Sequence, residues 1–414
     1  MFPQNFLWGA ATSSHQVEGL NIKNDWWQWE AQKRVKYPSG EATRHYGLFE
    51  NDFKLAADLN HNAHRFSIEW SRIEPKEGVF DEEEIRHYQE VIFSLRQYRI
   101  EPVVTLHHFT NPQWFSDKGG WLNPKASEWF ARYVEKVVAS LGVQVQFWIT
   151  VNEPEIFVYH GYAIGIWPPG ERSFKKSWQV INNLVKCHQK AYLKIHEVYR
   201  KNQWSAPKVS IAKNLMVFKP CPNSSNPLRY VSVFLRNRYF NNYFLKKING
   251  FMDFIGVNYY LREFVSADKV FNAGIIGAKC NKVHGHVKRV DKMGWDSYPQ
   301  GLYEILLRLK KYRLPILITE NGTCEENDDL RWQFIHDHVV VIEKAINQKI
   351  PVIGYLYWSL LDNFEWHHGF GPRFGLIEVD YNTYQRKPRE SAMKLSRIYK
   401  TNRLSGVERE TSNK

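Results

Sequence analysis

The chain has 414 residues, of which 43% are hydrophobic and 15% aromatic, so its composition supports a large apolar core and excludes an intrinsically disordered protein. Its formal net charge of +13 raises nucleic acid as a partner, but no nucleic-acid-binding motif accompanies the charge. No segment reaches the roughly 18 apolar residues that a membrane-spanning helix needs, and the amino terminus lacks a secretory signal pattern.

The excess positive charge is concentrated in residues 186–250, which contain 13 Lys or Arg and one acid, Glu197. A solvated basic face explains this segment more simply than a functional patch. We therefore expect no nucleic-acid partner, and the role of the basic face stays open.

Eight short apolar runs with the character of β-strands recur along the chain, and amphipathic segments separate them. The runs cover residues 7–11, 63–68, 102–107, 146–151, 209–214, 254–258, 315–319 and 352–357. Strands that alternate with helices indicate βα units and a parallel sheet. Eight such units predict an α/β fold of the (β/α)₈ TIM barrel type, with its active site at the carboxyl ends of the strands.

Several of the expected helices have clear start signals. Asp81 precedes three consecutive Glu, Asn123 and Pro124 together predict an N-cap and a first helical Pro, and Asp328 begins a third helix. A final helix is expected near residues 387–400. We predict a single catalytic domain over residues 1–402 and a polar, disordered tail over residues 403–414.

The four cysteines are widely separated and show no metal-ligand spacing. They are Cys187, Cys221, Cys280 and Cys324. This pattern favours free thiols without a structural disulfide, in a reducing, cytoplasmic location.

Polar and aromatic side chains follow most of the predicted strands. They include Gln16, Arg65, His107, His108, Asn152, Glu153, Asn258, Tyr260, Glu320, Trp358, Glu365 and Trp366. Adjacent strand residues point to opposite faces, so His107 and His108 are not expected to share a metal ion. Such a set of donors, acceptors and flat rings suits a ligand with many hydroxyl groups.

Two glutamates stand out because each closes an apolar strand-like run: Glu153 before Pro154, and Glu320 before Asn321 and Gly322. Either one alone is more often an ordinary rim residue. Two facing carboxylates, however, are the groups that glycoside hydrolysis uses.

Four segments together are more specific. They are FLWGAATSSHQVEG at 6–19, TVNEP at 150–154, LITENG at 317–322, and WSLLDNFEW at 358–366 followed by RFG at 373–375. In these segments the chain resembles glycoside hydrolase family 1, the family of retaining β-glucosidases and β-galactosidases, and the resemblance covers nearly its whole length.

The resemblance implies a retaining, exo-acting β-glycosidase without a cofactor, in which Glu320 is the nucleophile and Glu153 the acid/base. The positions it implies for holding the sugar are Gln16, His108, Asn152, Trp358, Glu365 and Trp366. Those implied to orient the nucleophile are Arg65, Asn258 and Tyr260. It also implies a cis peptide bond between Trp358 and Ser359.

Two features depart from the family pattern. Phe109 stands where the family usually has Trp, which removes an indole N–H, and the segment between Glu153 and Asn258 is short. Glu365 and Trp366 argue against a phospho-glycosidase, since a carboxylate there would repel a 6-phosphate. The alternative hypothesis is a non-catalytic sugar-binding or scaffold protein on the same fold.

Overall fold

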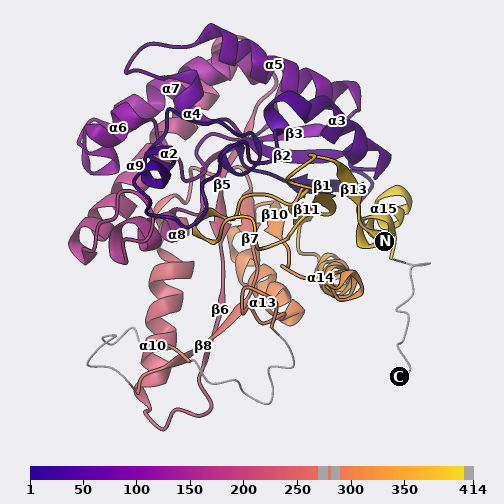
Figure 1. Ribbon diagram of the computed structural model, residues 1–414. Coiled ribbons are helices and arrows are strands. Elements are labelled where there is room, and N and C mark those ends of the chain that lie inside the picture. Colours follow the sequence, from indigo (N-terminus) through magenta and orange to yellow (C-terminus); the bar gives the residue numbers. More distant parts are fainter. Residues whose placement is uncertain (269–277, 281–289, 405–414) are drawn as a thin grey trace.

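Eight parallel strands close into a barrel in the order β1-β11-β10-β7-β5-β4-β3-β2 (Figure 1). The computed structural model describes residues 1–268, 278–280 and 290–404. The barrel strands are β1 Leu7–Ala11, β2 Ala63–Ser67, β3 Glu101–Thr105, β4 Phe147–Asn152, β5 Lys208–Asn214, β7 Ile255–Asn258, β10 Ile316–Asn321 and β11 Val352–Trp358. The predicted (β/α)₈ barrel is therefore confirmed, and each predicted run overlaps one of these strands.

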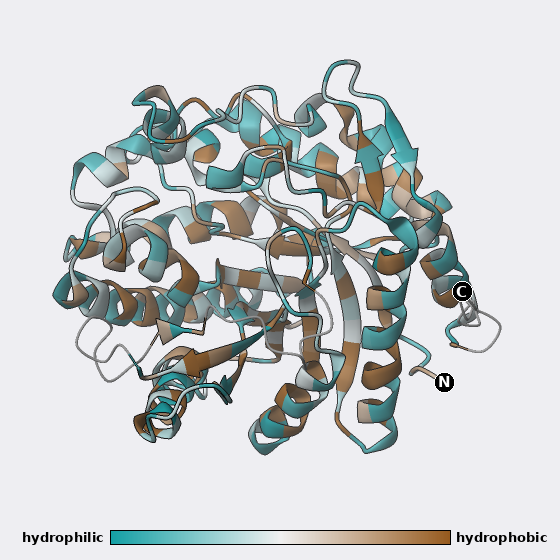
Figure 2. Ribbon diagram, turned by 60° about the horizontal axis from the view of Figure 1, so that its bottom comes forward, coloured by the Kyte–Doolittle hydropathy of each residue, from teal (hydrophilic) through white to brown (hydrophobic). Residues whose placement is uncertain are grey.

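The outer layer consists of helices that follow the strands. The longer ones are α3 His45–Asp58, α5 Glu82–Gln97, α7 Ala126–Leu141, α9 Phe174–Lys201, α13 Pro299–Leu309, α14 Asp328–Asn347 and α15 Glu390–Thr401. Hydrophobic residues lie toward the sheet and hydrophilic ones toward the outside (Figure 2). The apolar layer between strands and helices thus forms the main core.

Shorter helical elements lie mostly in the loops. The α-helices are α1 Ser14–Val17, α2 Asp25–Ala31, α4 Trp70–Ile73, α6 Gln113–Asp117, α8 Pro154–Val158, α10 Leu228–Arg236 and α11 Tyr243–Lys247. The 3₁₀ and π turns are η1 Gly120–Leu122, η2 Gly142–Gln144, η3 Tyr159–Ala163, η4 Asn237–Asn241, η6 Lys310–Tyr312 and η7 Trp366–His368.

The barrel interior is filled by side chains from alternate strand positions. They are Ala63, Val103, Phe147, Ile149, Ala212, Phe254, Leu317 and Leu356. Gly9 shows how closely the strands approach, since a Cβ at this position would lie 1.7 Å from the carbonyl oxygen of Ala63. The interior is a packed core, so a ligand can enter only at an end of the barrel.

Two helix starts test the sequence signals. Asp81 caps α5 by accepting from the backbone N–H groups of Glu83 and Glu84, as expected. The predicted start, with Asn123 as N-cap and Pro124 as first helical residue, is wrong by two residues, because the N-cap of α7 is Lys125 and the helix begins at Ala126. The Asn123 side chain instead accepts from the Lys125 N–H at 2.8 Å, which forms a turn before the helix.

A second sheet, which the sequence patterns did not predict, lies outside the barrel with α10 (Figure 1). Its strands are β6 Val217–Pro220, β8 Arg262–Ser266 and β9 Ala278–Lys279. Two further strands, β12 Ile377–Val379 and β13 Arg386–Pro388, form a small antiparallel pair.

This second sheet also corrects the prediction about cysteines. Cys221 follows β6 and Cys280 follows β9, and the structure joins the two in a disulfide. The expectation of free thiols was therefore wrong for this pair, because 59 residues separate the two cysteines and only the sheet brings them together. Cys187 and Cys324 are free and buried.

The carboxyl-terminal end of the chain is described only in part. Helix α15 ends at Thr401, close to the predicted end. Most of the predicted polar tail, residues 405–414, lies outside the described residues.

Candidate active site

The carboxyl ends of the barrel strands surround a cavity of about 330 Å³. Nine of the residues predicted from the sequence line it: Gln16, His108, Asn152, Glu153, Tyr260, Glu320, Trp358, Glu365 and Trp366. Arg65 and Asn258 lie behind this lining and contact it through hydrogen bonds. The structure thus brings all eleven predicted site residues together.

Glu153 reaches the cavity because of an unusual turn at the end of β4. Its backbone is left-handed, with φ 42° and ψ 60°, and Pro154 begins α8 immediately afterwards. The Glu153 N–H donates to the carbonyl of Ala212 at 2.8 Å, which ties the turn to β5. A non-glycine residue pays for this conformation with about 1–3 kcal/mol of strain, and such strain is commonly found at functional sites.

The Glu153 carboxylate is buried between two amides. Asn214, at the end of β5, and Asn258, at the end of β7, each donate from Nδ2 to its Oε1 at 2.8 Å. Burial, together with the negative charge of Glu320, raises the pKa of Glu153 to about 7. This carboxyl can therefore hold a proton near neutral pH.

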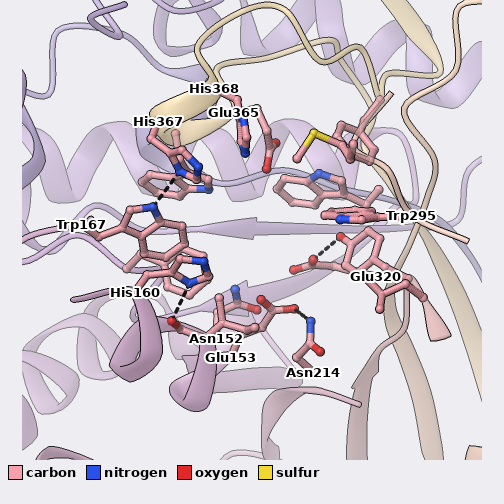
Figure 3. A pocket seen from close by; sticks show the side chains of 18 of the residues that line it. Asn152, Glu153, His160, Trp167, Asn214, Trp295, Glu320, Glu365, His367 and His368 are labelled. Atoms are coloured by element: carbon pink, nitrogen blue, oxygen red, sulfur yellow. Dashed lines mark hydrogen bonds between the residues drawn. The ribbon is translucent and has the colours of Figure 1, made fainter. Parts of the chain in front are cut away.

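Glu320, at the end of β10, has a cationic partner instead. Arg65 Nη1 donates to its Oε1 at 2.5 Å, and the Tyr260 hydroxyl donates to its Oε2 at 2.5 Å. Burial raises its pKa, and both Arg65 and Tyr260 oppose that rise by stabilising the charged form. Figure 3 shows the Glu153 and Glu320 carboxylates pointing into the same cavity.

One hydrogen-bond network joins the two carboxylates. Arg65 Nη2 donates to Asn152 Oδ1 at 2.7 Å, and the same oxygen accepts from Asn258 at 3.1 Å. Asn258 in turn accepts from the Thr319 hydroxyl at 2.7 Å. Because these groups lie on four different strands, the barrel itself fixes the relative orientation of Glu153 and Glu320.

The amide of Asn152 also defines the state of His108. Since Asn152 Oδ1 accepts two hydrogen bonds, its Nδ2 must be the group 3.1 Å from His108 Nε2. His108 Nε2 is then an acceptor, and the hydrogen lies on Nδ1. Burial lowers the pKa of His108 well below its usual value, with Arg65 adding to the effect, so the ring is neutral.

A third carboxylate, Glu365, lies on the opposite side of the cavity from Glu153 (Figure 3). Gln16 Nε2 donates to its Oε2 at 3.2 Å. Burial, and then the charge of Glu320, raises the pKa of Glu365 to about 8.

Aromatic rings complete this side of the site. The His108 ring is nearly parallel to those of Trp358 and Trp366, at centroid distances of 5.9 Å and 6.3 Å. The Trp358–Ser359 peptide bond is cis, as the resemblance implied. Flat rings beside carboxylate and amide groups suit a pyranose, whose faces are apolar and whose rim carries hydroxyls.

The sequence patterns missed several lining residues. Asn214 has the same signal as the predicted residues, since it ends a strand, and could have been found. His367 and His368 directly follow Trp366, and both line the cavity. Trp167 comes from the long loop after η3 and carried no positional signal.

Trp167 occupies the region beside Phe109, where the family usually has a larger ring. Its ring centroid lies 5.0 Å from that of Phe109 and 5.6 Å from that of Trp366. Its indole N–H donates to His367 Nδ1 at 3.0 Å, and His160 stacks on its other side at 4.4 Å (Figure 3). Phe109, Trp167 and Trp366 thus pack against one another at this edge of the cavity.

The described part of the chain contains no group of three or more His, Cys, Asp or Glu arranged to hold a metal ion. His107 and His108 have separate partners, since His107 Nε2 lies 3.0 Å from Asn111 Oδ1.

Comparison with known proteins gives a consistent family match. The model of glycosyl hydrolase family 1 matches residues 1–247 and 239–404. "Beta-glucosidase A" of Thermotoga maritima is 30% identical, over 97% of this chain and 98% of its own length. "Beta-galactosidase" of Pyrococcus woesei is also 30% identical, over 96% of each chain.

Solved structures agree with these relatives. A β-glycosidase from Pyrococcus horikoshii is 40% identical, with a TM-score of 0.89, over 96% of this chain and 94% of that one. A β-glucosidase from Thermotoga maritima in complex with glucoimidazole is 29% identical, with a TM-score of 0.87, over 97% and 99%.

Proposed function

The chain belongs to glycosyl hydrolase family 1, and on this premise we propose that Glu320 and Glu153 are the nucleophile and the acid/base of its retaining β-glycosidase reaction. The observation that supports this assignment is the difference between their surroundings. Glu320 has a guanidinium and a phenol as partners, while Glu153 has only neutral amide donors. The first environment favours a charged carboxylate and the second a protonated one.

In the first step, a Glu320 oxygen attacks the anomeric carbon and the bond to the leaving oxygen breaks. Glu153 gives its proton to that oxygen, so the aglycone leaves as an alcohol. The product is a glycosyl ester of Glu320.

In the second step, Glu153 removes a proton from water, and the resulting oxygen attacks the anomeric carbon and displaces Glu320. The ester has no negative charge, so the pKa of Glu153 falls once Glu320 is glycosylated, and Glu153 can then act as a base. Two inversions leave the sugar in its original β configuration. We expect kcat/KM to fall above about pH 7, where Glu153 of the substrate-free enzyme loses its proton.

We also propose roles for the surrounding residues. Gln16, His108, Asn152 and Glu365 would hold the sugar hydroxyls, and Trp358 and Trp366 would flank the ring. Arg65, Asn258 and Tyr260 would orient the two carboxylates, in keeping with their hydrogen bonds. The buried Nδ1 of His108 has no hydrogen-bond partner among the described residues, which supports a donor role toward a ligand oxygen.

A substitution at Glu320 tests the catalytic assignment. We expect Glu320→Ala to reduce kcat for p-nitrophenyl β-glucoside, β-galactoside and β-fucoside by at least about 10⁴-fold, because a methyl side chain cannot form the covalent intermediate. The exposed Glu90, on α5, provides a matched control, and Glu90→Ala should keep full activity. Equal turnover by Glu320→Ala and the wild type would refute the assignment.

The stereochemical course is tested separately. Proton NMR of the first-formed sugar should show the β anomer before mutarotation. An initial α anomer would mean that water attacks directly and that Glu320 is not a nucleophile. The relative kcat/KM over the three aryl glycosides would identify the preferred sugar.

The basic segment is less free to bind a partner than its composition suggests. Lys219 pairs with Glu304 at 3.0 Å, Arg236 pairs with Glu263, and Lys194 lies 3.3 Å from Glu135. These carboxylates come from outside the segment. We propose that it is mainly an ordinary solvated face, with a β-glycoside as the ligand of the protein and no nucleic acid.

A cytoplasmic location remains a proposal. No helix among residues 1–268, 278–280 and 290–404 is long and apolar enough to cross a bilayer. The Cys221–Cys280 bridge weighs against a reducing compartment. Counting alkylated thiols in protein extracted with and without reductant would show whether the bridge forms in the cell.

A further inference from the structure

A buried ion pair lies directly behind the turn that carries Glu153. The Lys213 ammonium is 3.1 Å from Glu155 Oε2, and the two side chains are 0% and 9% exposed. Lys213 Nζ also donates to the Asn214 carbonyl at 2.5 Å and lies 4.7 Å from the centre of the Phe240 ring. Neither Lys213 nor Glu155 lines the cavity, so neither is placed to touch a substrate.

The pair belongs to a two-point attachment between β5 and the start of α8. Consecutive residues of β5 point to opposite faces, so Asn214 faces the cavity while Lys213 faces the helices. Asn214 donates to Glu153, and Lys213 pairs with Glu155 two residues later. The rigid Pro154 lies between the two glutamates, so a shift of Glu155 would be transmitted to Glu153.

Glu155 is held by this contact and by little else. Neither of its carboxylate oxygens makes a well-formed hydrogen bond with a described group. A buried carboxylate without other donors depends on a nearby cation, and removal of that cation would leave the charge uncompensated. Burial raises the pKa of Glu155 and the charge of Lys213 opposes that rise, so Lys213 is the group that favours the charged form of Glu155.

We infer that Lys213 and Glu155 are positioning residues, which hold the Glu153 carboxyl in the orientation needed to protonate the leaving oxygen. This inference rests on the proposed function, because it gives a role to residues that act through Glu153. It concerns the first reaction step most strongly, since the proton must reach one particular oxygen.

The pair also acts on Glu153 through charge, and other groups contribute. The charges of Glu155 and Glu153 both act on Lys213. Glu153 faces Glu320 from β10 and Arg65 from β2, whose charges act on its pKa. The charge of Glu153 in turn raises the pKa values of Tyr260 and Glu365, which also face it. On α9, which also packs against β5, burial lowers the pKa of His188 to about 4, so it stays neutral in the assay range.

Removing one member of the pair therefore leaves an unbalanced charge near Glu153, and the sign depends on which member is removed. Loss of Lys213 removes a positive charge, which favours the protonated form of Glu153. Loss of Glu155 leaves the ammonium without its partner, which favours the ionised form. Loss of both members restores electroneutrality.

The test compares leaving groups of different acidity. 2,4-Dinitrophenolate leaves without protonation, whereas phenol needs an acid. In Lys213→Met we expect kcat/KM for phenyl β-glucoside to fall about tenfold or more, while that for 2,4-dinitrophenyl β-glucoside falls less than about twofold. A merely structural defect would lower both values by the same factor.

The pH profile gives a second readout. The alkaline limb of kcat/KM should move up by about 0.5–1 pH unit in Lys213→Met and down in Glu155→Gln, and it should return near the wild-type position in the double variant. Lys54→Met is the control, because Lys54 forms an exposed pair with Asp58 at 2.7 Å on α3. This control should change neither the limb nor the leaving-group ratio.

If Lys213→Met does not fold, Glu155→Gln carries the same test, and the charge-conserving Lys213→Arg should leave the alkaline limb in place. The inference would be overturned if folded Lys213→Met and Glu155→Gln kept both the alkaline limb of kcat/KM and the phenyl to 2,4-dinitrophenyl ratio of the wild type. In that case Glu320→Ala would still be inactive. Failure of the proposed function has a different signature, namely an active Glu320→Ala.

Discussion

At the level of single residues, the site contains three buried carboxylic acids whose surroundings differ. Glu320 has Arg65, Glu153 has two amides, and Glu365 has one weak contact with Gln16. The less compensation a carboxylate has, the more its burial favours the protonated acid. Glu365 has the fewest stabilising partners, so it should lose its proton at the highest pH of the three.

Glu365 should make the folded protein less stable as the pH rises. Its pKa is about 8 in the folded state, above its value in an unfolded chain, so its contribution is fully present at low pH and is lost as the pH rises toward 8. The amide that replaces the carboxyl group in Glu365→Gln does not ionise in this pH range. We expect its free energy of unfolding, relative to that of the wild type, to be about 2–4 kcal/mol higher at pH 8.5 than at pH 5.

Urea unfolding at the two pH values measures this difference. Glu90→Gln, on the exposed side of α5, is the control and should show the same offset at both pH values. A pH-independent offset for Glu365→Gln would mean that Glu365 is ionised in the folded protein throughout this range. Activity should fall in Glu365→Gln at every pH, because the amide keeps only one acceptor oxygen, and a neutral one, for the sugar hydroxyls.

Residue-level interpretation of the sequence worked where a strand end defines the position of a side chain. Glu153, Glu320 and Asn258 could be predicted because each follows an apolar run and the barrel brings strand ends together. Trp167 could not be predicted, since its position depends on the loop that follows η3 and not on the end of a strand. Asn214 had the strand-end signal, and its omission was an error of interpretation.

At the level of elements, the chain just after β10 lies close to the end of β11, next to Glu320. A Cβ on Gly322 would lie 1.9 Å from the carbonyl oxygen of Trp358. The backbone of β11 cannot move away without shifting the Trp358 ring, which borders the cavity. Gly322 is thus needed for packing.

We expect Gly322→Ala to destabilise the protein by about 1–3 kcal/mol and to reduce kcat/KM by about tenfold or more, because the strand ends must separate. Gly47→Ala is the control, since a Cβ at Gly47 on α3 meets nothing within 4 Å. That change should be neutral or slightly stabilising. Thermal unfolding and kinetics of both variants check this, and wild-type behaviour of Gly322→Ala would contradict the tight contact.

Elements differed in how well the sequence predicted them. Barrel strands such as β1 and β5 were found within one residue, because their apolar runs are bounded by turn residues. The sheet of β6, β8 and β9 was not, since its strands are short and pair with distant partners. The Cys221–Cys280 bridge was missed for the same reason.

At the level of the whole molecule, the barrel is closed by contacts between the first and last parts of the described chain. Asn402, just after α15, accepts from the Trp8 indole at 2.8 Å and donates to the carbonyls of Phe2 and Pro3 at 3.1 Å and 2.9 Å. One side chain thus links β1 and the segment before it to the final helix.

We expect Asn402→Ala to lower the free energy of unfolding by about 1–3 kcal/mol, since it removes all three side-chain hydrogen bonds. Asn402→Asp keeps the acceptor for Trp8 but places a carboxylate oxygen against the carbonyls of Phe2 and Pro3, so it should be no more stable than Asn402→Ala. Urea unfolding ranks the three proteins. Equal stability of wild type and Asn402→Ala would show that these contacts contribute nothing to closure.

The high pKa of Glu365 has a consequence for ligand affinity. In the proposed role, Glu365 accepts hydrogen bonds from sugar hydroxyls, and its anion accepts them best. Binding near neutral pH would therefore expel a proton into the buffer. Affinity should then strengthen with alkalinity over the same range in which the acid Glu153 loses its proton. The enzyme would hold its substrate most tightly where it turns it over most slowly, so its working optimum is a compromise between two opposing titrations.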